Sequence, residues 1–182
     1  MAKQPEEFND ALIEFIRRQH VYFVATAPNA ASGHVNCSPK GLDSLEVLGP
    51  TTLVYRDFVG SGAETIAHLR ENARIVVMFC AFEGPPKIVR VHGRGTVVEP
   101  GDPGFAELLQ RFGAKPGTRA FIRVDAERIA ISCGYGVPLM TYQGDRTQLT
   151  AWAERKGNDA LVAYQRENNL TSIDGLPALR MP

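Results

Sequence analysis

The chain has 182 residues with 20 basic and 20 acidic side chains, so its formal charge is zero, and 44% of its residues are hydrophobic. That length suits one domain, and the balanced charge argues against a nucleic-acid-binding protein, which normally carries a basic surface. No apolar run approaches the roughly 18 residues of a membrane span, and the acidic N-terminal stretch predicts no secretory signal peptide. Three widely spaced cysteines without a CxxC pair predict reduced thiols and a cytoplasmic location.

The first predicted element is an amphipathic helix over residues 5–19. Its apolar residues fall at i, i+4, i+7 and i+8, which is the spacing of one buried helix face; they are Phe8, Leu12, Phe15 and Ile16. Pro5 suits the first turn, because proline lacks only an N–H that has no helical partner there. The two glutamates that follow favour the positive end of the helix dipole.

The middle of the chain alternates short apolar runs with turn residues, which is typical of β-strands. Strands are predicted at 22–27, 34–41, 51–57, 75–80, 87–98, 120–125 and 128–132, and helices at 64–72 and 104–112. Gly93 and Gly95 predict a bulge or a tight bend in the longest run. Six or seven short strands predict a nearly closed barrel over residues 20–135, since closure removes exposed strand edges.

A fourth helix is predicted over 149–168, and Gly157 near its middle should break or kink it. The tail from 169 to 182 is expected to be irregular. No repeat, low-complexity tract or linker divides the sequence, so we expect one domain over residues 1–182. The fold class is mainly β with peripheral helices.

The turn Gly60-Ser61-Gly62 before the 64–72 helix has the features of an anion site. Its glycines let backbone N–H groups approach a ligand, Ser61 adds a hydroxyl, and the helix N-terminus adds partial positive charge. The simpler interpretation is that Ser61 only caps a short helix.

Two basic residues could join such a site. If the second and third strands pair antiparallel, Lys40 and Arg56 can lie near one another, and both are suitable donors to a phosphate. Each is also interpretable as a solvated surface cation.

Three runs carry a family resemblance: Ser38-Pro39-Lys40-Gly41, Gly60-Ser61-Gly62-Ala63-Glu64-Thr65 and Phe82-Glu83-Gly84-Pro85-Pro86. With them the sequence resembles the pyridoxamine 5′-phosphate oxidase-related branch of the FMN-binding split barrels, over roughly residues 10–180. The resemblance implies an antiparallel split β-barrel that dimerises with itself and holds FMN at the subunit interface, with the phosphate between the second strand and the helix start. Tyr55 matches the family pattern, but the basic residues are displaced from their usual places. Pyridoxamine phosphate oxidation itself is therefore not expected.

Within this resemblance the candidate cofactor-binding residues are Ser38, Lys40, Tyr55, Arg56, Ser61, Gly62, Thr65, Lys87 and Arg90. Lys87 and Arg90 are included because in the family their strand reaches a flavin shared by two chains. Apolar residues on the barrel strands, Val76, Met78, Val89 and Val91, exceed what one small core needs, so some should face the second chain.

The implied function is that of an FMN-dependent oxidoreductase of unassigned substrate. The alternatives are a non-catalytic flavin-binding or storage protein, a deazaflavin-dependent reductase and a haem-binding split barrel. No residue is identified as a catalytic acid or base, and the four histidines lack metal-ligand spacing. Trp152 is expected in a packed helix face rather than against the flavin, and Cys37 is expected as a small buried strand residue rather than a reactive thiol.

Overall fold

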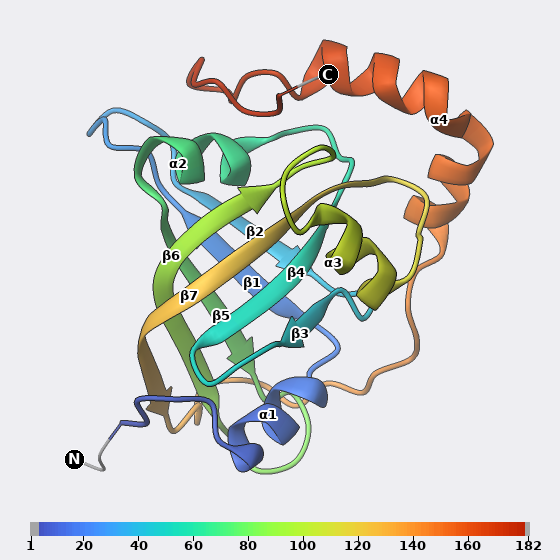
Figure 1. Cartoon of the computed structure of the whole chain (residues 1–182). Coiled ribbons are helices and arrows are strands. Elements are labelled where there is room, and N and C mark those ends of the chain that lie inside the picture. Colours follow the sequence, from blue (N-terminus) through green and yellow to red (C-terminus); the bar gives the residue numbers. More distant parts are fainter. Residues whose placement is uncertain (1–3, 181–182) are drawn as a thin grey trace.

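The alternating apolar runs form one antiparallel sheet of seven strands (Figure 1). The computed structural model describes residues 4–180. The strands are β1 (Tyr22–Thr26), β2 (Asn36–Lys40), β3 (Leu45–Val47), β4 (Thr52–Phe58), β5 (Arg74–Cys80), β6 (Ile88–Val98) and β7 (Thr118–Ser132). They lie in the order β2-β1-β5-β6-β7-β4-β3, and the sheet curls into a half-barrel with β2 and β3 as its edges. The predicted split-barrel class is confirmed.

The sheet differs from the prediction at two strands. β7 is one strand of 15 residues where two strands were predicted, because the polar segment at Glu127 and Arg128 is extended and not a turn. The register against β6 shifts between His92 and Gly93, which confirms the predicted bulge. A Cβ at Gly93 would lie 2.2 Å from the carbonyl oxygen of Asp125, so the two strands approach closely there. β3 was missed because a three-residue strand has no readable period.

The inner face of the sheet holds the main core, and two helices close its ends (Figure 1). α2 (Glu64–Asn72) covers one end and matches its predicted bounds. α1 (Asp10–Arg17) covers the other, but it begins five residues later than predicted. The reason is Asn9, whose Oδ1 accepts a hydrogen bond from the Leu12 N–H at 3.0 Å and caps the helix.

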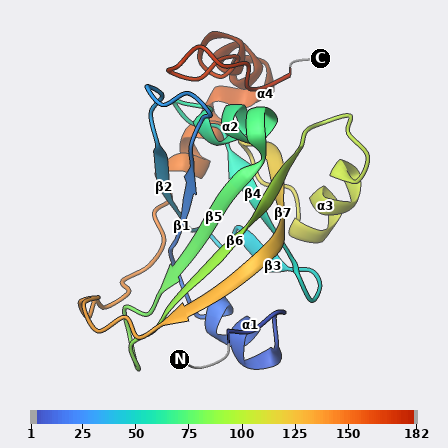
Figure 2. The same ribbon diagram turned by 90° about the vertical axis from the view of Figure 1, so that its left-hand side faces the viewer.

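The outer face of the sheet is covered on one half only. α3 (Phe105–Phe112) packs its apolar side on β4, β6 and β7, with Phe121 between the Phe105 and Phe112 rings. None of the four helices described within residues 4–180 covers the other half, over β1 and β5; Figure 2 shows α1 and α2 at the two ends of these strands and α3 to one side.

The strand register settles which apolar residues face outward. Phe23 pairs with Met78 and Ala25 with Val76, so these four share the uncovered outer face. Val89 and Val91 lie on the inner face and are fully buried in the core. Half of the residues expected to supply surplus apolar surface are therefore core residues.

α4 (Gln148–Asn168) bends at Gly157, as predicted, where φ is 71° and ψ is 165°. The chain then runs back across α2 (Figure 1). Its end is fixed by Glu99, which is 2% exposed and accepts hydrogen bonds at 2.8 Å from both the N–H and the Nε of Arg180. None of the helices within residues 4–180 is long and apolar enough to cross a membrane.

α2 buries an ionisable side chain, His68, in the core beside β1. His68 is 0% exposed, its Nδ1 lies 2.9 Å from Oγ1 of Thr26, and its Nε2 meets no partner among residues 4–180. Burial lowers the pKa of His68, although Asp174, Glu64 and Glu71 partly oppose the shift.

The pH dependence of stability should reveal this histidine. The unfolded chain binds a proton near the usual histidine value of 6.5, whereas the native chain resists it. The free energy of unfolding should therefore fall as pH drops below that value, by at most about 1.4 kcal/mol per pH unit from this group. Urea unfolding of His68→Gln should show a flatter pH profile. The control His92→Gln, on the outer face, should keep the wild-type profile; equal profiles in all three proteins would contradict the argument.

Candidate functional site

The candidate site lies where the curled sheet fails to close. β2 pairs with β1 on one side and forms the sheet edge on the other. Its residues Asn36, Ser38 and Lys40 point across the gap toward α2 and the end of β4, since alternate strand residues share a face. Lys40 Nζ reaches Oδ1 of Asp57 at 3.1 Å, and Asn36 Nδ2 donates to Oγ1 of Thr65 at 2.9 Å. Side chains, not backbone hydrogen bonds, thus bridge the split.

Asp57 is the centre of this bridge. It is 1% exposed, and Arg119 at the start of β7 donates to its second oxygen, Oδ2, at 2.7 Å. Burial alone would raise the pKa of Asp57, but the charges of Arg119 and Lys40 and their hydrogen bonds hold it below its usual range. The carboxylate is therefore ionised at neutral pH.

A cavity of about 590 Å³ opens beside the bridge. Five of the predicted binding residues line it, namely Ser38, Lys40, Ser61, Gly62 and Thr65. The structure thus brings together the end of β2 and the Gly-Ser-Gly turn before α2, as the sequence predicts. We call this the phosphate cavity.

The N-terminus of α2 reaches this cavity without a capping side chain. The N-cap residue is Ala63, and in the described part of the chain, residues 4–180, no side chain caps the first-turn amides. Ser61 is exposed and does not cap the helix, so the simpler interpretation of this serine is wrong. The positive end of the helix dipole is left for a ligand. One carboxylate would repel an anion at this helix end. Glu64 folds back toward Gly62, and its Oε1 accepts a hydrogen bond from the N–H of Ile173 at 3.3 Å.

Arg56 does not join this group. It is 2% exposed and lies on the outer face under α3, where Nη2 donates to the carbonyl oxygens of Phe112 at 2.7 Å and Gly113 at 2.6 Å. Its guanidinium therefore fixes the end of α3. Arg119 occupies the place expected for Arg56, with Nη1 donating to the carbonyl of Gly62 at 2.8 Å. The sequence offered one signal for Arg119, a lone cation at the start of an apolar run.

Tyr55 lies in the core next to the site but does not line the cavity. It is 0% exposed, and its hydroxyl meets no partner among residues 4–180. Lys40 Nζ lies 5.6 Å from the centre of its ring. Burial raises the pKa of the Tyr55 phenol, and the Asp57 charge adds to the shift. The Tyr55 ring therefore packs against the Lys40 side chain from the core side.

The remaining predicted residues lie elsewhere. Arg90 is on the outer face and donates to Ser132 at 3.1 Å, and Lys87 lines a different cavity. Cys37 is exposed, so the expectation of a buried residue is wrong; it lies on β2, which is an edge strand of the sheet. Trp152 packs on Tyr164 of α4 with ring centres 5.3 Å apart, as expected of a packed helix face.

Removing the Asp57 charge should destabilise the fold strongly. In Asp57→Asn the buried Arg119 loses its counter-charge, which costs about 3–5 kcal/mol of unfolding free energy. The matched change Asp125→Asn breaks a pair in which both side chains are about half exposed and should cost less than about 1 kcal/mol. Chemical denaturation at pH 7 measures both. The difference between wild type and Asp57→Asn should shrink as pH falls below 3.8, because the unfolded wild-type chain takes up a proton there while native Asp57, with its lowered pKa, resists it; equal costs at pH 7 would refute the bridge.

Known proteins are similar to this chain in sequence and in fold. A family model described as pyridoxamine 5'-phosphate oxidase matches residues 8–133. The pyridoxamine 5'-phosphate oxidase family protein ustO of Aspergillus flavus is 42% identical over 191 residues, covering 96% of this chain and 76% of that protein. Two crystal structures of HupZ from Group A Streptococcus, 19% and 20% identical, have a TM-score of 0.53 and cover 68% and 69% of this chain and 98% and 94% of theirs, which supports the fold alone. The chain belongs to the pyridoxamine 5'-phosphate oxidase family.

Proposed function

We propose that this protein is a flavoprotein that binds FMN through the phosphate cavity and acts as an FMN-dependent oxidoreductase. One observation carries the proposal: Lys40, Arg119 and the uncapped start of α2 lie around a single cavity. Cations, hydroxyls and free helix amides are the donors that a phosphate monoester needs. Membership of the family supports flavin as the molecule that carries this phosphate.

The donor set fits a phosphate despite the acids nearby. Asp57 takes one N–H from Lys40 and one from Arg119. Nη2 of Arg119 makes no hydrogen bond to any residue from 4 to 180, and the ammonium of Lys40 keeps two further protons. Gly60 leaves the backbone before Ser61 open, since a Cβ there would meet nothing within 4 Å, whereas a Cβ at Gly62 would lie 2.3 Å from Oε2 of Glu64. Both cations thus have donors left for an anion.

The chain's own part in the chemistry is to bind and to orient. A bound flavin would supply the hydride transfer, which needs no protein acid or base. Lys40 and Arg119 would hold the phosphate end, and the buried Asp57 would keep both cations aimed at it. Asn36 would fix the Ser38 hydroxyl, which donates to Asn36 Oδ1 at 3.1 Å.

Flavin binding should depend on Lys40 and not on Arg56. Lys40→Met removes a charge-assisted contact worth about 1.5–3 kcal/mol, so the Kd for FMN should rise roughly 10- to 150-fold. Arg56→Met removes an equal charge outside the cavity and should lower the melting temperature with little change in Kd. Fluorescence titration of the apo protein at a temperature where all variants are folded measures both.

Riboflavin and a reductant complete this test. Riboflavin has no phosphate, so Lys40→Met should leave its binding unchanged; an equal loss for both flavins would place the phosphate elsewhere. Bleaching of the yellow oxidised flavin by NADH or NADPH supports an oxidoreductase. Stable colour under both donors would favour the storage protein, and a haem or deazaflavin spectrum of the purified protein would contradict FMN.

A homodimer is part of the same proposal, because the outer face of β1 and β5 carries Phe23, Ala25, Val76 and Met78 with no helix over it. Light scattering should give twice the chain mass of 19.9 kDa. Met78→Glu places a charge on this face and should shift the mass toward the monomer. The control Thr96→Glu, at an exposed site of β6, should not; a monomeric wild type at micromolar concentration would rule the dimer out.

A further inference from the structure

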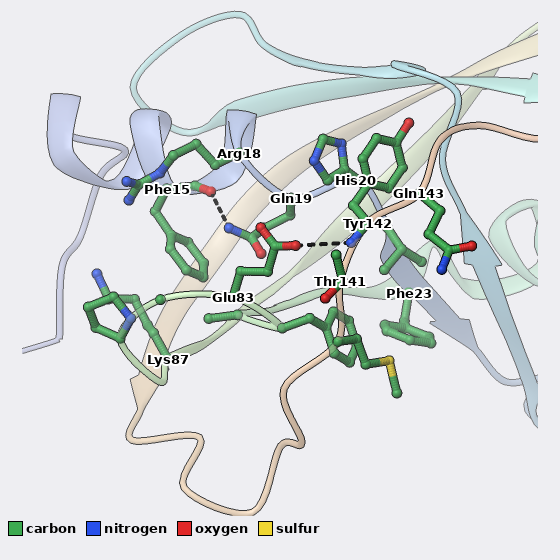
Figure 3. Close-up of a pocket in the computed structure, with 16 residues that line it drawn as sticks. Phe15, Arg18, Gln19, His20, Phe23, Glu83, Lys87, Thr141, Tyr142 and Gln143 are labelled. Carbon is green, nitrogen blue, oxygen red and sulfur yellow. Dashed lines mark hydrogen bonds between the residues drawn. The ribbon is translucent and has the colours of Figure 1, made fainter.

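A second cavity, of about 710 Å³, lies at the α1 end of the sheet. Its walls come from the end of α1, the start of β1, the β5–β6 loop and residues 140–143, as Figure 3 shows. It shares no lining residue with the phosphate cavity. Its volume is in the range of about 300–1,000 Å³ that is typical of small-molecule sites.

The outer wall is a segment of the 133–147 connection that is tied in place. The N–H of Met140 donates to the Phe82 carbonyl at 2.9 Å, and that of Tyr142 to Oε1 of Glu83 at 3.0 Å. The Tyr142 ring also stacks on His20, with ring centres 3.5 Å apart and planes at 7° (Figure 3). Three contacts thus hold an otherwise irregular segment across the opening.

The lining is chemically suited to a flat, apolar ligand that carries one negative group. Most of it is apolar, from Phe15, Val21, Phe23, Ala81, Phe82, Pro85 and Met140. The one acid, Glu83, already accepts a hydrogen bond from the Tyr142 N–H. The Lys87 ammonium lies 4.9 Å from the centre of the Phe15 ring and pairs with no carboxylate between residues 4 and 180. Arg18 adds a second cation to the lining, and its Nε lies 3.9 Å from Oε1 of Glu14.

We propose that this cavity is a second ligand site, independent of the phosphate cavity, which binds a planar aromatic carboxylate. The ring lies among the apolar side chains beside the stacked His20 and Tyr142. The carboxylate meets the ammonium of Lys87, which has no carboxylate partner among residues 4–180. A neutral aromatic molecule of the same shape makes the same apolar contacts but not the charged contact, so it binds less tightly.

Two probes of one shape test this: 2-naphthoate and the neutral 2-naphthylmethanol. Isothermal titration should show that 2-naphthoate binds wild type at least about tenfold more tightly, as expected of one charge-assisted contact. Lys87→Met should abolish that preference and leave the alcohol unchanged. The matched control Lys156→Met removes a lysine that also lies over aromatic rings, 5.5 Å from Trp152, and should change neither probe. Tyr142→Ala opens the wall and should weaken both probes, while retained FMN binding reports that it is folded.

Three results would overturn the proposal. They are no binding of either probe to wild type, an unchanged preference in Lys87→Met, and displacement of 2-naphthoate by riboflavin, which would make this cavity part of the flavin site. FMN titration of the same variants keeps the two proposals apart, because Lys87→Met should bind FMN like wild type. A protein that binds 2-naphthoate but no FMN would refute the proposed function alone.

Discussion

The structure depends on one buried carboxylate at the place where its sheet fails to close. Asp57 receives Lys40 from the edge strand β2 and Arg119 from β7, two strands that do not pair in the sheet. Backbone hydrogen bonds hold β2 on one side only, so side chains must hold it on the other. A buried charge is costly unless it is paired and hydrogen-bonded, and here both carboxylate oxygens are used. The same two cations that satisfy Asp57 also line the phosphate cavity, so fold stability and the proposed anion binding would share their residues.

α3 covers one half of the outer sheet face and leaves the other half open, and this difference explains where several side chains lie. Along β4, Tyr55 and Asp57 point inward and are buried there, whereas Arg56 points outward and is buried because α3 covers that part of the outer face. The Arg56 guanidinium therefore donates hydrogen bonds to the carbonyl oxygens at the end of α3. The half without a helix keeps Phe23 and Met78 partly exposed, which is the surface available to another chain.

The sequence predicts the fold well because the signals are local. Periodicity located six of the seven strands, and turn glycines located the start of α2 and the bend in α4. The sequence patterns failed where the position of a side chain depends on a residue far away in the sequence. The run from Leu53 to Asp57 is buried at every position, so its period is hidden and the outward direction of Arg56 cannot be read. Arg119 meets Asp57 across 62 residues, and no local pattern reports that contact. Three segments far apart in the sequence form the second cavity, so the sequence identified Lys87 as a candidate residue but could not show which cavity it lines.

The edge strand β2 also limits how copies of this chain can meet. An open edge offers unpaired backbone groups to another strand, which is a common route to uncontrolled sheet extension. β2 is only five residues long and contains Pro39, whose nitrogen cannot donate; proline is tolerated in a strand where that nitrogen points away from the paired neighbour. The open side of β2 therefore lacks a donor at its fourth residue, and continuous pairing with a second chain is interrupted there. Growth of a ribbon from this edge is disfavoured, so the chain can carry an exposed edge without forming fibrils through it.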